Sequence, residues 1–275
     1  MKGVAVNRIP ELASESPDLS RPVCLHEGDH AVYWVGSEEP SPFRCNAYLV
    51  VDGEHRILMD PGSTMHHFPQ VRARVEQIVP ASSLTHVVAH HQDPDLCDSL
   101  PSWLELAPDL TIVTTPRVRV LLPYYGFPSD VNWLDVSPED STTLELDHGS
   151  LVFITAPFLH FPEAFVTYDE TTGFLFSGDI GAAVEEDWRL VVEDWDRHWQ
   201  TMLPFHVFYM ASRKALRGFL RKIEPFPVSA ICPQHGSIIP PAQVQRALES
   251  LANLPCGLDL LYPASNIESV LSEIL

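Results

Sequence analysis

Short apolar runs dominate the first third of the chain. They are "AVYWVG" at 31–36, "NAYLVVDGEHRILMDPG" at 46–62 and "LTHVVAH" at 84–90. Runs of this length that are rich in Val, Leu and Tyr and bounded by turn residues predict β-strands. The Asp52-Gly53 pair interrupts the second run, and Asp-Gly between two apolar runs is a strong signal for a β-hairpin.

Apolar positions spaced by three and four residues predict helices between and after these strands. Phe68, Val71, Val75 and Ile78 show this spacing behind a start that contains Ser63 and a threonine, as an amphipathic helix requires. The other expected elements are a helix at 98–108, a strand at 110–115, hairpins around 147–150 and 169–173, a long helix at 195–223 that Pro204 should kink or split, a strand at 228–236 and a C-terminal helix at 266–275.

This order of elements divides the chain into two strand-rich halves, each with its own helices. It predicts an α+β fold in which two mixed β-sheets pack face to face with helices outside, an αββα sandwich. The chain has 275 residues, a length that suits one large domain or two small ones. Its 25 prolines are scattered and not gathered into a linker, so we expect a single domain over residues 1–275.

Charge and composition exclude several classes of function. With 17 Lys+Arg against 37 Asp+Glu, the formal net charge of −20 would repel a phosphate backbone, so nucleic acid is not an expected partner. The apolar runs are much shorter than the roughly 20 residues of a membrane span. The first 20 residues lack the apolar core of a secretion signal, so we expect a cytoplasmic protein. The five cysteines have no CxxC spacing, which argues against a thiolate zinc cluster or a disulfide framework.

The segment "VVAHHQDPDLC" at 87–97 contains several possible metal ligands directly after an apolar run. His91, Asp93 and Asp95 alternate along it, and an extended loop would direct all three side chains to one side. Pro94 favours that conformation because it disfavours helix at the preceding residue. Taken alone the pattern is weak, since an ordinary polar loop would also contain such residues.

Three more residues with metal-binding side chains each close an apolar run. They are His160 after "LVFITAPFL", Asp179 after "FLFSG" and His235 after "VSAICPQ". For each histidine taken singly, a structural role is as good an interpretation as metal binding. Strand ends in a layered core can converge, however, and six such residues at strand ends predict a two-metal centre.

These motifs resemble the metallo-β-lactamase superfamily and, within it, the di-iron core of the flavodiiron proteins and the related oxygen-binding di-iron proteins. The resemblance extends over nearly all of the chain, from "AVYWVG" through "CNAYLVVDGEHRILMDPGS" to "PQHG". The general motif of the superfamily is HxHxDH, and the flavodiiron branch has HxExDH. This chain has His91, Asp93 and Asp95, followed by Leu96 where a last histidine is expected.

The resemblance implies a set of metal ligands. One metal would be bound by His91, Asp93 and His160, the other by Asp95 and His235, and Asp179 would bridge them. Because Leu96 cannot bind a metal, the second site would be more labile or completed by water, His90 or a nearby tyrosine. Tyr124 and Tyr125 are candidates for donating hydrogen bonds to a bound oxygen species. A carboxylate in place of the second histidine favours iron, with zinc or manganese as substitutes.

The function implied by this resemblance is the binding of O2, or of NO or peroxide, at a two-iron centre. Such a protein would be an oxygen or iron sensor, or the oxidoreductase core of a flavodiiron-like reductase. The 275 residues contain no flavodoxin domain and no rubredoxin-like CxxC pair, so turnover would need a separate electron-donor protein. The resemblance also implies a homodimer and a small diatomic ligand or a signalling protein as partners.

Two other classes of function remain open from the sequence. A metal-dependent hydrolase of an ester, lactam or thioester would use the same fold, because most of the superfamily activates a metal-bound water. Asp93 and Leu96 argue against it, since both depart from the pattern that binds two zinc ions. A metal-free structural relic would require all six side chains to persist by accident. No catalytic residue beyond the metal ligands is assigned.

Overall fold

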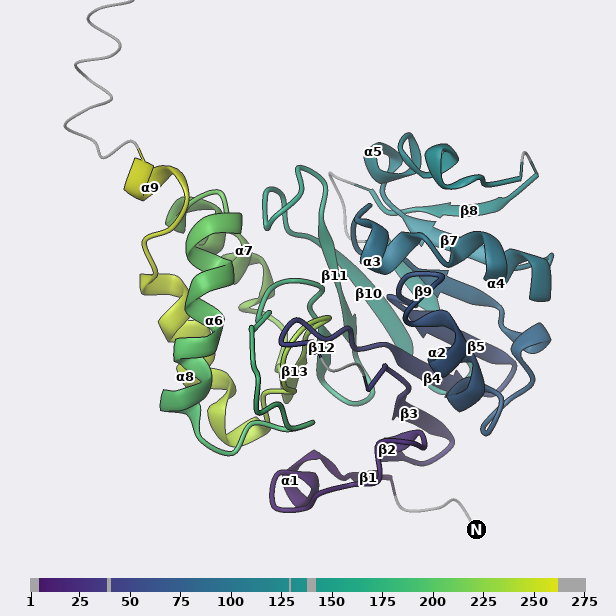
Figure 1. Ribbon diagram of the computed structural model, residues 1–275, viewed down its shortest axis with the longest axis horizontal. Coiled ribbons are helices and arrows are strands. Elements are labelled where there is room, and N and C mark those ends of the chain that lie inside the picture. The colour runs from purple at the N-terminus through teal and green to yellow at the C-terminus, as the bar shows by residue number, and fades with distance from the viewer. Residues whose placement is uncertain (1–4, 39–40, 129, 138–141, 262–275) are drawn as a thin grey trace, which may run out of the picture.

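Two β-sheets packed face to face form the centre of the molecule, with helices on both outer sides (Figure 1). The computed structural model describes residues 5–38, 41–128, 130–137 and 142–261. Its four layers are those of an αββα sandwich, which confirms the fold class predicted from the sequence. The C-terminal helix expected at 266–275 lies outside the described residues.

The first sheet has eight strands in the order of the chain, antiparallel from β1 to β5 and parallel from β5 to β8. The strands are β1 (Val6–Asn7), β2 (Val23–Glu27), β3 (His30–Trp34), β4 (Tyr48–Asp52), β5 (His55–Met59), β6 (His86–Val88), β7 (Thr111–Thr114) and β8 (Asn132–Asp135). The parallel half places the carboxyl ends of β5, β6 and β7 along one edge, where loops can carry a site.

The second sheet has five strands in the order β13-β12-β11-β10-β9, and only β12 and β13 pair in parallel among the strands described. The strands are β9 (Thr142–Glu145), β10 (Ser150–Thr155), β11 (Phe165–Asp169), β12 (Phe174–Phe176) and β13 (Ala230–Cys232). Both sheets are therefore mixed, as predicted.

The expected hairpins form where turn residues interrupt the apolar runs. Asp52 pairs with His55 across the β4–β5 turn, and Gly53 there has a φ of 55°, a left-handed conformation that glycine adopts without strain. The turns at 147–150 and 169–173 join β9 to β10 and β11 to β12 in the same way.

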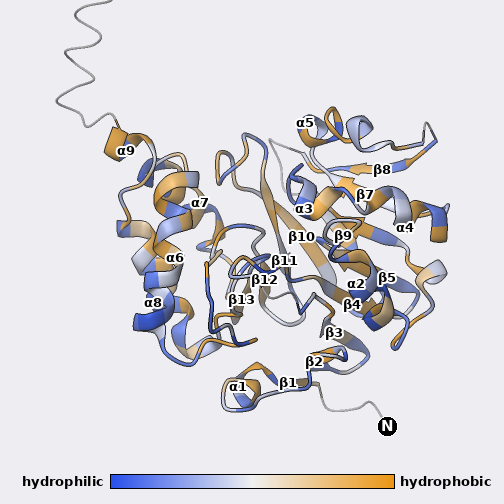
Figure 2. Cartoon of the chain, in the orientation of Figure 1, coloured by the Kyte–Doolittle hydropathy of each residue, from blue (hydrophilic) through white to orange (hydrophobic). Residues whose placement is uncertain are grey.

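Helices cover the outer face of each sheet, with α6, α7 and α8 on one side and α2, α4 and α5 on the other (Figure 1). Figure 2 shows hydrophilic and hydrophobic residues on the same helices α7 and α8, as expected for helices that bury one face. The helices are α1 (Ile9–Leu12), α2 (Phe68–Val75), α3 (Pro94–Cys97), α4 (Leu100–Leu106), α5 (Pro116–Arg119), α6 (Trp195–Tyr209), α7 (Arg213–Ile223), α8 (Pro241–Asn253) and α9 (Leu258–Leu261), with 3-10 turns at Ala81–Ser83 and Leu122–Tyr125.

The long helix expected at 195–223 is two helices, but the break does not lie at Pro204. Pro204 is inside α6, which continues to Tyr209. The chain is extended at Met210, and the Ser212 hydroxyl then accepts a hydrogen bond from the Ala215 N–H and so caps the start of α7. The position of the break is thus set by a helix cap downstream of the proline.

Three apolar clusters hold the layers together, and alternation along β4 assigns its residues to two of them. The Tyr48 ring contacts the Phe176 ring between the two sheets, with 5.2 Å between ring centroids. The next residue, Leu49, points to the opposite face and packs in the cluster of Trp103 beneath α4. Leu216 of α7 belongs to the third cluster, which covers the second sheet. Within the described part of the chain, none of the helices combines the length and the apolar content that crossing a membrane requires.

Candidate metal centre

The six side chains singled out in the sequence meet at one end of the sandwich, five of them on loops between the strands and Asp95 in the short helix α3. Three of them lie three residues beyond a strand end: His91 after β6, Asp179 after β12 and His235 after β13. Because β12 and β13 are parallel and Phe176 pairs with Cys232, the same offset brings Asp179 and His235 side by side. His160 lies in the middle of the β10–β11 loop, equally far from both strands.

Two imidazoles and two carboxylates form the first half of the cluster. The His160 Nε2 atom lies 2.8 Å from Asp179 Oδ2 and 3.3 Å from Asp93 Oδ2. The His91 Nε2 atom lies 3.3 Å from Asp179 Oδ2 and 3.6 Å from Asp93 Oδ2. The ligand atoms of His91, His160 and Asp179 lie within 4.8 Å of one another, and Asp93 contacts both imidazoles, an arrangement that suits the ligands of one metal ion.

The second half of the cluster contains Asp95 and His235, and the structure adds Cys45 to it. The His235 Nε2 atom lies 3.0 Å from Asp95 Oδ2, while its Nδ1 donates a hydrogen bond to the Arg44 carbonyl oxygen at 2.9 Å. That bond turns Nε2 toward the cluster. Cys45 was not among the residues expected from the sequence, because nothing in its own neighbourhood there indicates a site.

Asp179 joins the two halves. Its Oδ2 atom contacts His91 and His160, whereas its Oδ1 atom lies 3.6 Å from His235 Nε2. This Oδ1 atom is buried and has no hydrogen-bond partner among the described residues. A buried carboxylate oxygen without a partner is costly unless a cation lies beside it, so this donor set fits a pair of metal ions.

The loop that carries Asp93 and Asp95 differs from the extended conformation predicted for it. Asp93 is extended, with ψ at 150°, but Pro94 is the first residue of the short helix α3. Proline is favoured at this position because its missing N–H would be unpaired there in any case. The helix also explains Leu96, whose side chain points away from the cluster and is fully buried in the core beneath α4.

Comparison with known proteins places the chain in a family. Residues 43–236, more than two thirds of the sequence, match the family described as ODP family beta lactamase. The chain belongs to this family. This confirms the resemblance to the di-iron branch of the metallo-β-lactamase superfamily.

Two solved structures of ODP proteins are similar to this chain over almost their whole length. The peroxy di-iron species of the chemotaxis sensor ODP is 30% identical, with a TM-score of 0.78, and the match covers 87% of this chain and 98% of the sensor. The apo state of the chemotaxis sensor ODP from T. denticola is 31% identical, with a TM-score of 0.75, over 90% and 98%. The flavodiiron protein from Giardia intestinalis is 21% identical, with a TM-score of 0.71, and shares the fold over 80% of this chain and 56% of its own.

Among curated proteins, the nitric oxide reductase of Moorella thermoacetica is 30% identical over 175 residues, which are 58% of this chain and 42% of the reductase. A diflavin flavoprotein of Nostoc is 23% identical over 70% of this chain and 33% of its own length. The ODP-family chain thus spans less than half the length of these two relatives.

His90 has a different role in the ODP-family chain from the substitute ligand considered for it. Its Nδ1 lies 2.6 Å from Asp60 Oδ2, and its Nε2 lies 2.8 Å from the Thr167 hydroxyl. Both nitrogens are therefore engaged, and neither can bind a metal without breaking a buried hydrogen bond. His90 instead ties the end of β6 to Asp60 after β5 and to Thr167 of the other sheet, directly before the loop that carries His91.

The two tyrosines considered as donors to a bound ligand behave differently. Tyr124 is 87% exposed and does not line the cavity over the cluster. The Tyr125 hydroxyl donates a hydrogen bond of 2.7 Å to the Gln92 carbonyl oxygen, between His91 and Asp93. Neither hydroxyl donates a hydrogen bond to the cluster in this structure, and a role toward a bound ligand stays a prediction. Tyr125 holds the loop that carries two candidate ligands.

We expect Tyr125→Phe to destabilise the chain by about 1 kcal/mol and to weaken metal binding, because it leaves the Gln92 carbonyl without its partner and loosens the loop. Tyr124→Phe is the matched control and should change neither quantity. Urea unfolding and metal titration of both variants measure the effects. Identical behaviour of the two variants would show that the Tyr125 hydrogen bond does not position the loop.

Opposite charges stabilise the cluster in the absence of metal. Burial lowers the pKa of His160, but hydrogen bonds and charge attraction from Asp179 and Asp93 outweigh it and raise the pKa to about 10. Burial raises the pKa of Asp93, and the neighbouring imidazoles outweigh it and hold that pKa well below the usual range of an aspartate. Protons on the histidines thus occupy the place of cations, and metal binding must release them.

A cavity of about 540 Å³ opens over the cluster and has mostly apolar walls. Phe43 lies over the His235 ring, with 3.7 Å between ring centroids, and Tyr209 stacks on Phe205 at 4.6 Å. Val184 and Pro204 complete the apolar lining. The cavity therefore admits small apolar molecules to the side of the cluster on which His160 and Asp179 lie.

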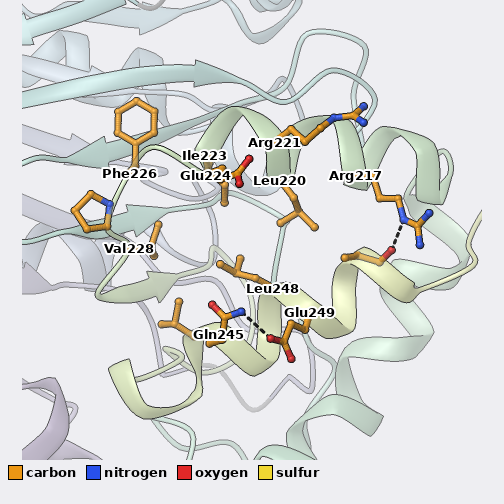
Figure 3. Close-up of a pocket in the computed structure, with 13 residues that line it drawn as sticks. Arg217, Leu220, Arg221, Ile223, Glu224, Phe226, Val228, Gln245, Leu248 and Glu249 are labelled. Atoms are coloured by element: carbon orange, nitrogen blue, oxygen red, sulfur yellow. Dashed lines mark hydrogen bonds between the residues drawn. The ribbon is translucent and has the colours of Figure 1, made fainter.

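A second cavity, of about 610 Å³, lies between α7 and α8 and contains none of the six candidate residues (Figure 3). Leu220 and Leu248 line its floor. At its rim Arg217 donates a hydrogen bond to the Ala252 carbonyl oxygen, and Gln245 donates one to Glu249. These polar groups already have partners within the chain, so nothing at this cavity indicates a bound ligand.

Proposed function

We propose that this ODP-family chain binds two iron ions side by side and, through them, O2 or another small diatomic such as NO. The observation that carries the proposal is the placement of Asp179, whose two oxygens face two separate groups of ligands. A carboxylate in this position can bridge two metal ions, and its unpartnered Oδ1 atom supports a cation on that side.

The ligand assignment follows from the contacts. His91, Asp93 and His160 would bind one ion, Asp95 and His235 the other, and Asp179 both. Three carboxylates among six ligands favour a hard ion that accepts oxygen ligands, and iron fits this set better than zinc, which prefers nitrogen and sulfur. Zinc or manganese would be substitutes. The similarity to the peroxy di-iron species of the chemotaxis sensor ODP supports the same choice.

The side chains around the cluster prepare it for a small apolar ligand. When bound, a pair of ferrous ions supplies an open position and one electron from each ion to a diatomic molecule. Phe43, Phe205 and Tyr209 keep bulk water away from that position and leave an apolar path to it. The His235 ring would keep its orientation with metal bound, because its Nδ1 donates a hydrogen bond to the Arg44 carbonyl oxygen and leaves Nε2 for the ion.

The biological role we propose is that of an oxygen or iron sensor, which accords with the chemotaxis sensors that the chain resembles over 98% of their length. A role as the core of a reductase would need electrons from a separate donor protein. The homodimer and the cytoplasmic location stay predictions of the family resemblance. The hydrolase interpretation gains no support from Asp93, whose carboxylate replaces an imidazole of the zinc pattern.

Anaerobic loading with Fe(II) tests the proposal. We expect roughly two iron ions per chain, as in other two-metal sites, and a new visible absorption band on exposure to air. Both should be lost in His160→Ala and kept in His86→Ala, whose histidine lies at the opposite end of β6. Metal analysis and absorption spectroscopy measure the two quantities.

Two outcomes would contradict the di-iron function. One is purified protein with two zinc ions that Fe(II) cannot displace. The other is cleavage of a chromogenic ester or lactam that disappears in His160→Ala, which would favour the hydrolase.

A further inference from the structure

Cys45 lies beside the second half of the cluster because its backbone runs along that of His235. The two residues form an isolated antiparallel bridge, and the next residue, Asn46, donates a 2.6 Å backbone hydrogen bond to the Gln234 carbonyl oxygen. The Asn46 side chain also donates to the carbonyl oxygens of Pro233 and Gly236 on either side. These three hydrogen bonds fix the segment, so the thiol has a defined position.

The distance from the Cys45 sulfur to Asp95 is close to that between two ligands of one metal ion. Its Sγ atom lies 3.9 Å from Asp95 Oδ2, and the possible ligand atoms of Cys45, Asp95 and His235 all lie within 4.8 Å of one another. The sulfur also lies 3.8 Å from His235 Nδ1, the ring nitrogen that donates to the Arg44 carbonyl oxygen. Metal–sulfur and metal–oxygen bonds of about 2.3 and 2.1 Å at a tetrahedral angle place the two ligand atoms roughly 3.6 Å apart. The sulfur would therefore need to move by only a few tenths of an ångström. Cys45 is 5% exposed, so water does not compete for this side of the ion.

A second observation indicates that an ion belongs at this point. The Asp179 Oδ1 atom, in a side chain that is 3% exposed, faces His235 Nε2 at 3.6 Å and has no hydrogen-bond partner among the described residues. Leu96 stands where the family resemblance implies a last motif histidine, and its side chain is buried in the core beneath α4. The second half of the cluster therefore lacks one donor, and the sulfur lies within reach of the other two.

We propose that Cys45 is a metal ligand, and that its thiolate binds the second ion together with Asp95, His235 and the shared Asp179. This inference rests on the proposed two-metal function. On binding, the thiol loses its proton to solvent and a metal–sulfur bond forms, without oxidation or reduction. The thiolate and the carboxylates of Asp93, Asp95 and Asp179 then carry four negative charges, which equal the charge of two divalent ions.

Two other side chains considered as donors near this ion are already engaged. The Cys97 thiol, next to Leu96, donates a hydrogen bond of 3.1 Å to the His91 carbonyl oxygen and is fully buried. His90 has both nitrogens bound to Asp60 and Thr167. Cys97 is thus a matched control for Cys45, since both thiols are buried close to the cluster and only one faces the second group of ligands.

The proposal makes the two ions chemically different. One has only nitrogen and oxygen ligands, and the other has one sulfur, a soft donor that favours Zn, Cu(I) or iron over Mg or Mn. We therefore expect manganese to fill the sulfur-containing position less readily than zinc, cobalt or iron.

Co(II) loading and zinc X-ray absorption test the role of Cys45 without any assay of activity. We expect Co(II)-loaded wild type to show an intense sulfur-to-cobalt charge-transfer band in the near ultraviolet. This band should disappear in Cys45→Ser and Cys45→Ala and persist in Cys97→Ala. The zinc absorption fine structure of the wild type should contain a sulfur shell at about 2.3 Å, which requires no variant to fold.

The outcomes separate this inference from the proposed function. Two results would overturn the role of Cys45 and leave the two-metal function intact. One is wild type that binds two ions with nitrogen and oxygen ligands alone, and the other is a charge-transfer band that persists in a folded Cys45→Ser variant. Wild type that binds no metal stoichiometrically would overturn both. A sulfur shell in the wild type supports the inference even if both Cys45 variants fail to fold.

Discussion

Asp179→Asn is expected to abolish the paired metal site. Among the candidate ligands, Asp179 contacts both halves of the cluster, with His91 and His160 on one oxygen and His235 facing the other. Asparagine has the same size but no charge, and its amide nitrogen cannot bind a cation. Loss of a residue that only supports a ligand typically costs 10–100-fold in metal affinity, so loss of a bridging ligand should cost at least about 100-fold.

Metal titration and elemental analysis measure this effect as a fall from two ions per chain to one or none. Asp98→Asn is a suitable control, since Asp98 follows α3 but accepts a hydrogen bond from the Thr64 N–H and lies outside the cluster. The control should keep both ions. Two ions bound by Asp179→Asn with unchanged affinity would remove the bridging role.

His30→Ala is expected to destabilise the fold by about 3–5 kcal/mol, the cost of leaving buried charges without their partner. His30 of β3 lies between two carboxylates, with Nδ1 2.7 Å from Asp52 Oδ2 and Nε2 2.8 Å from Asp169 Oδ2. All three side chains are buried, and Asp169 belongs to the second sheet. The substitution therefore removes the buried partner that the two carboxylates share, together with a link between the sheets, although Asp52 keeps its contact with His148 and Asp169 keeps its hydrogen bonds from Thr171 and Thr172.

His148→Ala is the matched control for this prediction. His148 also contacts Asp52, at 2.7 Å, but its side chain is 43% exposed, so its loss should cost only about 0–1 kcal/mol. Urea unfolding of the two variants measures the difference in the free energy of unfolding. Equal and small effects would show that the buried ion pairs contribute little to stability.

The contribution of His30 should also depend on pH. Burial lowers its pKa, but the hydrogen bonds and charges of Asp169 and Asp52 outweigh burial and raise the pKa above its usual value. Because the folded chain binds this proton more tightly than the unfolded chain, the stabilisation is complete below about pH 6.5 and is lost as the pH rises through the raised pKa. The destabilisation of His30→Ala relative to wild type should therefore shrink in alkaline buffer.

The sequence alone was sufficient for features that depend on neighbours along the chain. The Asp52-Gly53 hairpin follows from the local preference of glycine for a positive φ, and the strands follow from the length and spacing of apolar residues. The candidate residues were found in the same way, since His160, Asp179 and His235 each follow an apolar run. The fold class and the family resemblance rest on the order of these same segments.

Other features depend on residues that are distant in the sequence. Proline is compatible with both an extended loop and the first turn of a helix. At Pro94 the chain forms the helix α3, which allows Leu96 to pack into the core. Tyr124 and Tyr125 are equivalent as neighbours in sequence, and only the fold exposes one and turns the other toward Gln92.

The tertiary structure alone decided which groups share the second metal position. Cys45 and His235 are 190 residues apart, and their contact arises from a backbone bridge between segments that no local pattern connects. The engagement of His90 by Asp60 and Thr167 is of the same kind, because it joins residues that follow β5 and β6 to the middle of β11 in the other sheet. The sequence by itself thus determined which metal-binding side chains follow apolar runs, since that is a local property. The pairing of sheets and loops decided which of them face one another, because such contacts depend on packing across the whole fold.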